Sequence, residues 1–141
     1  MRTPDVNVLL YAVNHNCAQH EAAKAWMVES FARPQGVGFA WIALLGFLRL
    51  ATRSGIFAKP LNVQDALAVL DIWLSQPGAS IMSPTERHAG VLARLLMGAG
   101  SAGNLVSDAH LAALAIEHSA ELGSFDRDFE RFSGLRFQLL R

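Results

Sequence analysis

The chain has 141 residues, a length that fits one domain, which we place over residues 1–141. Twelve Lys and Arg residues balance twelve Asp and Glu residues, so the formal net charge is zero. This balance argues against a non-specific polyanion binder but leaves room for a local basic patch. An apolar fraction of 52% excludes a disordered chain and suggests that a partner covers part of the apolar surface.

Short predicted strands alternate with predicted helices along the whole chain. Strands are expected at residues 3–6, 37–39, 80–82, 121–125 and 135–139. Helices are expected at residues 17–31, 41–51, 63–74, 85–97 and 105–119. The apolar segment 8–13 is compatible with either a strand or a helix, and glycine-rich turns include residues 98–103. The alternation predicts an α/β fold with a mostly parallel central sheet.

Cysteine usage and hydropathy indicate the compartment. Cys17 is the only cysteine, which excludes a disulfide within the chain and favours a reducing, cytoplasmic location. No apolar run approaches the roughly 20 residues of a membrane-spanning helix, so we expect no membrane partner. The N-terminal stretch carries Asp5 among its apolar residues and has no small-residue cleavage site, so it does not resemble a signal peptide.

Four aspartates stand where a parallel sheet gathers functional residues, at the carboxyl ends of strands and at helix starts. Asp5 ends the first strand, and Asp108 lies in the first turn of the last long helix. Asp126 and Asp128 follow the fourth strand. Short carboxylates on converging strand ends are suited to a hard divalent cation such as Mg²⁺, which prefers oxygen ligands and keeps several waters. Those waters and open positions are available to a phosphate and an attacking hydroxide.

Each of these aspartates also has a purely structural interpretation. Asp5 could be a strand-end turn residue, and Asp108 a first-turn carboxylate favoured by the helix dipole. Asp126 and Asp128 could form a solvated turn. Bringing several carboxylates together without a cation raises the pKa of at least one of them, so their convergence would itself indicate function.

Three segments resemble PIN-domain ribonucleases, and the closest likeness is to the VapC toxins of bacterial VapBC toxin–antitoxin pairs. They are D-V-N-V-L-L-Y-A from residue 5, N-L-V-S-D-A-H-L-A-A-L-A-I-E-H from residue 104 and S-F-D-R-D-F-E-R-F from residue 124. The resemblance covers nearly the whole chain, including W-I-A-L-L-G-F-L-R-L from residue 41. It implies a three-layer α/β/α PIN fold and a Mg²⁺- or Mn²⁺-dependent endoribonuclease, in which a metal-activated water attacks an RNA phosphodiester.

The resemblance also assigns roles to individual residues. Asp5, Asp108 and Asp126 match the first, third and fourth acidic positions of the family and are the expected catalytic residues. The same three, with Asp128 at an additional acidic position, are the expected metal ligands. The expected supporting residues are Asn7 and Ser124.

One position departs from the family pattern. The second acidic position is usually a Glu, but Gly46 stands there in L-L-G-F-L-R. A glycine inside a helix costs roughly 1 kcal/mol relative to Ala, so this one is better explained by the space that it opens for water, a substrate group or a partner side chain. The lost ligand keeps open an alternative function, a degenerate PIN domain that binds RNA or antitoxin without cleavage. Candidate RNA phosphate contacts are Arg49, Arg53 and Arg127.

The resemblance implies partners as well. In the family the antitoxin's C-terminal tail lies across the helices beside the active site, and the toxin pairs with itself. A VapB-type antitoxin, an RNA substrate and a homodimer are therefore expected.

A third interpretation is a phosphoryl-transfer hydrolase with an aspartyl nucleophile. That chemistry needs an Asp two residues after Asp5, but Asn7 stands there, so the sequence disfavours this interpretation.

Histidines and the late glutamate are expected to have structural roles. The five His residues show no H-x₃-H spacing, so a zinc site is not predicted. His110 could orient a phosphate but is more simply a satisfied histidine. Glu117 lies two and a half helical turns after Asp108, so we expect it on the opposite face as a surface or salt-bridge residue.

Overall fold

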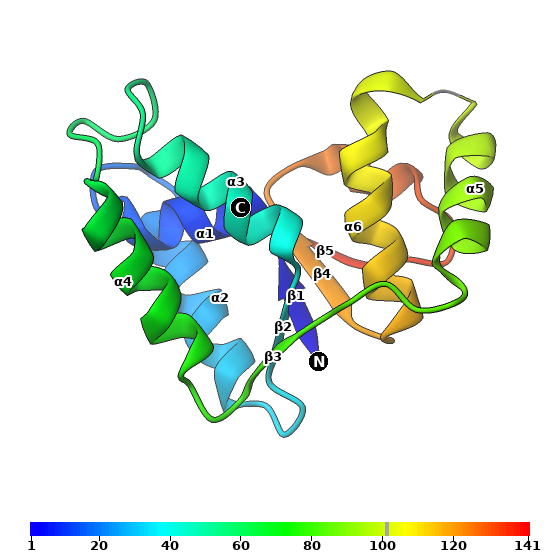
Figure 1. The fold of residues 1–141 in the computed structure, drawn as a ribbon, viewed down its shortest axis with the longest axis horizontal. Helices are drawn as coiled ribbons and strands as arrows, with labels where there is room; N and C mark the ends of the chain where they lie inside the picture. Colours follow the sequence, from blue (N-terminus) through cyan, green and yellow to red (C-terminus); the bar gives the residue numbers. More distant parts are fainter. Residues whose placement is uncertain (101) are drawn as a thin grey trace.

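The computed structural model describes residues 1–100 and 102–141, and five strands in this part of the chain form one sheet. They are β1 (Arg2–Pro4), β2 (Val37–Phe39), β3 (Ala79–Ile81), β4 (Glu121–Ser124) and β5 (Arg136–Leu139). The order across the sheet is β3-β2-β1-β4-β5, and every neighbouring pair is parallel (Figure 1). The predicted α/β fold with a parallel sheet is confirmed.

Helices cover both faces of this sheet, as the three-layer prediction requires (Figure 1). On one side lie α1 (Val6–Val13), α2 (His20–Ala32), α3 (Trp41–Ala51) and α4 (Val63–Leu74), and on the other lie α5 (His88–Ala99) and α6 (Val106–Glu117). Two 3₁₀ turns, η1 (Gly103–Leu105) and η2 (Arg127–Arg131), complete the elements. None of the helices described is long and apolar enough to cross a membrane.

Local capping explains where the first strand stops. The ambiguous segment 8–13 is helical, because the Asp5 side chain accepts a hydrogen bond from the Val6 backbone N–H and caps α1. The strand predicted at residues 3–6 therefore ends at Pro4. The turn predicted at residues 98–103 starts late, since α5 continues to Ala99, and its Ser101 lies outside the described residues.

Two apolar cores pack against the two faces of the sheet. The first core joins helices α1 to α4 and includes the fully buried Leu9, Phe39 and Phe47. The second joins α5, α6 and η2 and includes Leu122 and Phe129. Burial on both faces is typical of a parallel sheet, and each such side chain contributes about 1.5–3 kcal/mol of transfer free energy.

The strand order contains a switch point between two central strands of the sheet. From β1 the chain proceeds to β2 and β3 on one side, and β4 and β5 lie on the other. In open α/β sheets, ligands bind at such a switch point, outside the carboxyl ends of the strands. Here the switch point lies between β1 and β4, which end immediately before Asp5 and Phe125.

Candidate active site

One buried hydroxyl group joins the two strand ends at the switch point. Ser124 Oγ, at the end of β4, donates to Asp5 Oδ2 over 2.7 Å. The same oxygen accepts from Asn7 Nδ2 over 3.1 Å and from the Asp126 backbone N–H over 2.9 Å. Asn7 Oδ1 in turn accepts from the Phe125 N–H over 3.2 Å. The predicted supporting residues, Asn7 and Ser124, thus hold the first and fourth acidic positions together.

Asp5 is a buried carboxylate, with 8% of its surface exposed. Burial raises the pKa of this carboxyl, and the charge of Asp126 raises it further. Hydrogen bonds from Ser124 and from the Val6 N–H oppose that effect without cancelling it. Because Oδ1 and Oδ2 each accept one of these bonds, the carboxylate is fixed in orientation at the switch point.

Asp108 approaches from the other side, in the first turn of α6. Partial burial and the charges of Asp5, Asp126 and Asp128 raise the pKa of Asp108 to about 6. The charge of Arg131 acts in the opposite direction. The negative charges of Asp5, Asp126 and Asp128 each contribute to this rise, so these three carboxylates lie near enough to Asp108 to repel it. We call Asp5, Asp108, Asp126 and Asp128 the acidic cluster.

Asp126 precedes η2 as its N-cap, and Asp128 lies in the first turn of η2. Asp126 Oδ1 accepts from the Asp128 N–H over 2.9 Å and so caps this short turn. The exposed Asp128 forms an ion pair with Arg131 over 3.3 Å. Arg131 was missed by the sequence analysis, although its i,i+3 spacing from Asp128 could have indicated the pair.

A pocket of about 150 Å³ lies between α3 and α6 next to the acidic cluster. Asp5 and Asp108 form its acidic side, and Arg49 stands at its rim on α3. Its remaining lining is mostly apolar: Val6, Ile42, Ala43, Gly46, Ser107 and Leu111. We call this the acidic pocket. Ser107, which borders Asp108, is a second lining residue that the sequence analysis did not single out.

The donor set of the acidic cluster suits a hard divalent cation, because every ligand candidate is a carboxylate oxygen. The repulsion that raises the pKa of Asp108 is the penalty that a bound cation removes. The described residues do not, however, include three His, Cys, Asp or Glu side chains already gathered around one metal position. Asp5 and Asp126 each accept a backbone N–H with one oxygen, and a carboxylate has further lone pairs that remain available to a cation or to its waters.

The three arginines predicted to contact phosphate are not equivalent. Arg49 lines the acidic pocket, one helical turn after Gly46. Arg127 lies on η2 between Asp126 and Asp128 and is exposed. Arg53 is exposed beyond the end of α3 and is not part of the pocket lining. The structure therefore brings two of the three to the acidic cluster.

Of the two interpretations offered for Glu117, a surface residue is wrong, whereas a salt-bridge residue agrees with its close pairing with His88. The Glu117 side chain is fully buried between α5 and α6. One carboxylate oxygen accepts from the Thr85 N–H and hydroxyl, at 2.9 and 2.6 Å, and the other lies 2.5 Å from His88 Nδ1. His88 Nε2 in turn lies 2.9 Å from His110 Nδ1, which turns His110 toward His88. Glu117 does lie on the face of α6 opposite to Asp108, as expected, but α5 covers that face.

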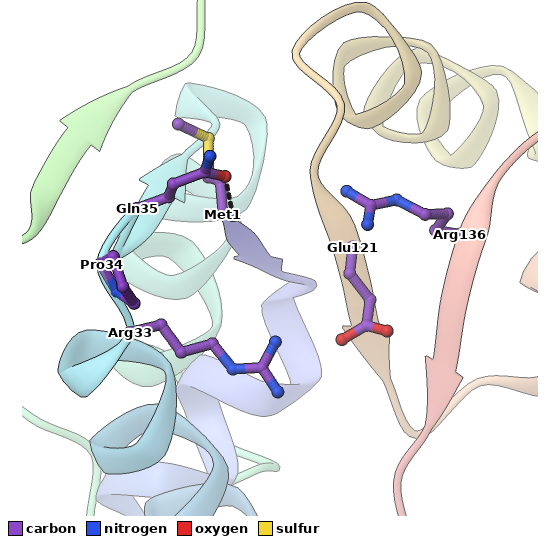
Figure 2. A pocket seen from close by; sticks show the side chains of 6 residues that line it. All are labelled: Met1, Arg33, Pro34, Gln35, Glu121 and Arg136. Carbon is purple, nitrogen blue, oxygen red and sulfur yellow. Dashed lines mark hydrogen bonds between the residues drawn. The ribbon is translucent and has the colours of Figure 1, made fainter.

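A second hollow lies at the opposite, amino-terminal edge of the sheet. It encloses about 500 Å³ and is lined by Met1, Arg33, Pro34, Gln35, Glu121 and Arg136. Figure 2 shows Arg33 and Arg136 on either side of Glu121. None of the predicted site residues lines this hollow, so it is separate from the acidic cluster.

Comparisons with known proteins agree with this fold. A sequence profile of the PIN domain matches residues 3–135. The chain is 47% identical to "Ribonuclease VapC37" of Mycobacterium tuberculosis over 137 residues, covering 97% of this chain and 95% of the relative. It is 41% identical to "Ribonuclease VapC33" of the same species, over 97% of this chain and 96% of the relative.

Two solved structures share the fold at low sequence identity. One is VapBC2 from Rickettsia felis bound to a DNA fragment from its promoter, with a TM-score of 0.73 and 20% identity over 99% of this chain and 98% of that one. The other is Mycobacterium tuberculosis VapC20, described as a sarcin–ricin loop cleaving toxin. Its TM-score is 0.69, with 19% identity over 96% of this chain and 99% of that one.

Proposed function

The chain belongs to the VapC ribonucleases of the PIN-domain family, and we propose that it is a toxin that cleaves RNA with Mg²⁺ or Mn²⁺. The observation that carries this proposal is that Asp5 and Asp108 line one pocket beside the switch point of the sheet, where the charge of Asp126 acts on both of them. We place this activity in the cytoplasm, where the substrate RNA and the reducing conditions suited to the free Cys17 are found.

The chain's own residues supply position and charge. Asp5, Asp108 and Asp126, with Asp128, would hold the cation, which when bound activates a water and offsets phosphate charge. Ser124 and the Val6 N–H orient Asp5, so that its carboxylate is set before substrate arrives. Arg49, at the rim of the acidic pocket, can donate to phosphate oxygens of RNA.

The experiment is cleavage of total bacterial RNA with Mg²⁺ or Mn²⁺, with Asp5→Asn as the test variant. We expect at least about a hundredfold loss of cleavage, because a preorganised charge at the reacting centre is removed. The matched control is Asp65→Asn, which changes an exposed carboxylate on α4. Equal cleavage by Asp5→Asn and the control would refute the proposal, and binding without cleavage would favour a degenerate domain.

Thermal unfolding gives a readout that is independent of cleavage. A cation that binds only the folded chain stabilises it by mass action, by about 2.7 kcal/mol at a hundredfold excess over its dissociation constant. We therefore expect the melting temperature to rise across a millimolar Mg²⁺ or Mn²⁺ series. Asp108→Asn should weaken this rise, and an unchanged wild-type melting temperature would contradict the cation site.

We further propose a VapB-type antitoxin as a partner of this chain. An apolar groove of about 460 Å³ lies between α3 and α4, where Trp41 and Leu67 are 48% and 49% exposed. Patches of this kind mark interaction sites. The test is co-purification with the product of a small adjacent gene, compared with Trp41→Ala and Leu67→Ala variants. Unchanged complex formation by both variants would exclude this groove.

A homodimer is the other proposed assembly. Apolar side chains stand exposed on α3, α5 and α6, among them Leu45, Met97 and Val106. Met97, at 81% exposed, has the most apolar surface to gain from a second copy. Sedimentation at micromolar concentration tests this assembly, and we expect Leu45→Asp to shift the chain to a monomer.

A further inference from the structure

The acidic pocket is lined by both charged and apolar side chains. Asp5, Asp108 and Arg49 stand on its charged side, whereas Val6, Ile42 and Leu111 give it apolar walls. A metal or phosphate alone requires only the charged side. The apolar walls therefore point to a ligand part that is itself flat or apolar.

Gly46 keeps this interior open. It is buried in α3, where glycine lowers helix stability relative to alanine. A Cβ atom at this position would meet only the Val6 side chain, with Cγ2 at 3.0 Å and Cβ at 3.6 Å. Val6 itself lines the pocket, so a side chain at position 46 would occupy the pocket rather than penetrate a backbone.

We propose that the acidic pocket receives one nucleobase of the RNA, next to the phosphate that is cut, and that the missing side chain of Gly46 makes room for it. This inference rests on the proposed ribonuclease function and adds a specificity determinant to it. RNA is recognised in single-stranded segments, where an unstacked base can enter a pocket.

The size of the pocket selects among bases. Its volume of about 150 Å³ is about half the volume of the smallest ordinary ligand pockets. The pocket therefore fits one ring rather than a whole nucleotide. A pyrimidine therefore fits better than a purine. Arg49 and Ser107 at the pocket offer donors for the carbonyl oxygen of such a ring. Asp5 and Asp108 lie beside it, where the adjoining phosphate would be cut.

The experiment measures binding without cleavage, in an Asp126→Asn background with Mg²⁺ present. Asp126 is not part of the pocket lining, so the pocket stays intact. The probes are fluorescein-labelled hexamers of U, C, A or G and an abasic hexamer with the same ribose–phosphate backbone, measured by anisotropy. We expect about tenfold tighter binding of a pyrimidine hexamer than of the abasic one, because the base buries surface against Val6, Ile42 and Leu111.

Glycine variants connect this preference to position 46. Gly46→Leu fills the pocket and should abolish the difference between pyrimidine and abasic hexamers. Gly46→Ala, which favours the helix, should reduce the difference while the far-UV circular dichroism stays native. The control is Gly90→Ala on α5, where an added Cβ meets nothing within 4 Å.

The base pocket would be overturned by equal affinity of the Asp126→Asn chain for abasic and base-bearing hexamers, by a purine preference, or by a preference that Gly46→Ala and Gly46→Leu leave unchanged in that background. Absence of binding to every hexamer would overturn it as well. A base preference in a chain that cleaves no RNA would instead reject the ribonuclease proposal and retain the pocket. The two proposals therefore fail separately.

Discussion

The Ser124 hydroxyl donates to the Asp5 carboxylate over 2.7 Å, across 119 residues of sequence. It joins the ends of β1 and β4, the two strands between which the sheet order reverses. Ser124 Oγ also accepts hydrogen bonds from the Asn7 side-chain amide and from the Asp126 N–H. The placement of both Asp5 and Asp126 therefore depends on this one buried oxygen. Hydrogen-bond networks of this kind stabilise the fold and position the site at once.

Ser124→Ala is expected to lower the free energy of unfolding by about 1–3 kcal/mol, because it leaves buried polar groups without partners. It should also raise the pKa of Asp5, since the Ser124 hydrogen bond lowers it. Urea unfolding measures the first effect. Ser75→Ala, which removes an exposed hydroxyl bonded to one carbonyl, is the control. A loss no larger than that of Ser75→Ala would contradict the network.

Asp108→Asn is expected to stabilise the cation-free chain at neutral pH. The folded pKa of about 6 lies above the ordinary 3.8, so the wild type loses stability as pH rises from about 4 to about 6. An asparagine removes that loss. We expect a gain of the order of 1 kcal/mol at pH 7.5, small because the side chain is half exposed, and none near pH 4. Melting temperatures of the variant and the wild type in EDTA, at pH 7.5 and near pH 4, test this prediction. An equal gain in stability at the two pH values would rule out the electrostatic cause.

Glu117→Gln is expected to destabilise the chain by about 2 kcal/mol at pH 7, because a buried, paired carboxylate is lost. Burial raises the pKa of Glu117, but hydrogen bonds from Thr85 and His88 outweigh it and hold the pKa below the usual 4.5. The stabilisation is therefore present above pH 4.5 and is lost as pH falls below that value. Unfolding at pH 7 and pH 3.5 measures the difference. Glu86→Gln, which changes an exposed carboxylate nearby, should leave the free energy of unfolding unchanged at either pH.

Arginine variants separate phosphate contacts from remote charges. Arg49→Ala and Arg127→Ala should each weaken RNA binding and lower the salt slope by about 0.7, as for one lost single-strand phosphate contact. Arg53→Ala tests whether RNA extends past the end of α3. Arg33→Ala, in the hollow at the opposite sheet edge, is the control for net charge. A slope that falls equally in the control would show that net charge alone matters.

Local patterns accounted for most of the fold. Apolar periodicity located nearly every helix and strand within about three residues, because each element buries one face or both. The order Asp5, Asp108, Asp126 indicated a site because sheet topology brings strand ends together. Periodicity left segment 8–13 open, since helix formation there depends on a cap from the Asp5 side chain.

By itself, the sequence determined the α/β class, the acidic residues and the family likeness, since these depend on residue types and on spacing along the chain. Only the tertiary structure decided that Ser124 joins Asp5 to Asp126, and that the space at Gly46 is lined by Asp5, Asp108 and apolar side chains. It also decided that Glu117 is buried against α5. Contacts between residues more than 25 positions apart follow from the packing of whole elements, which no local pattern of side chains specifies.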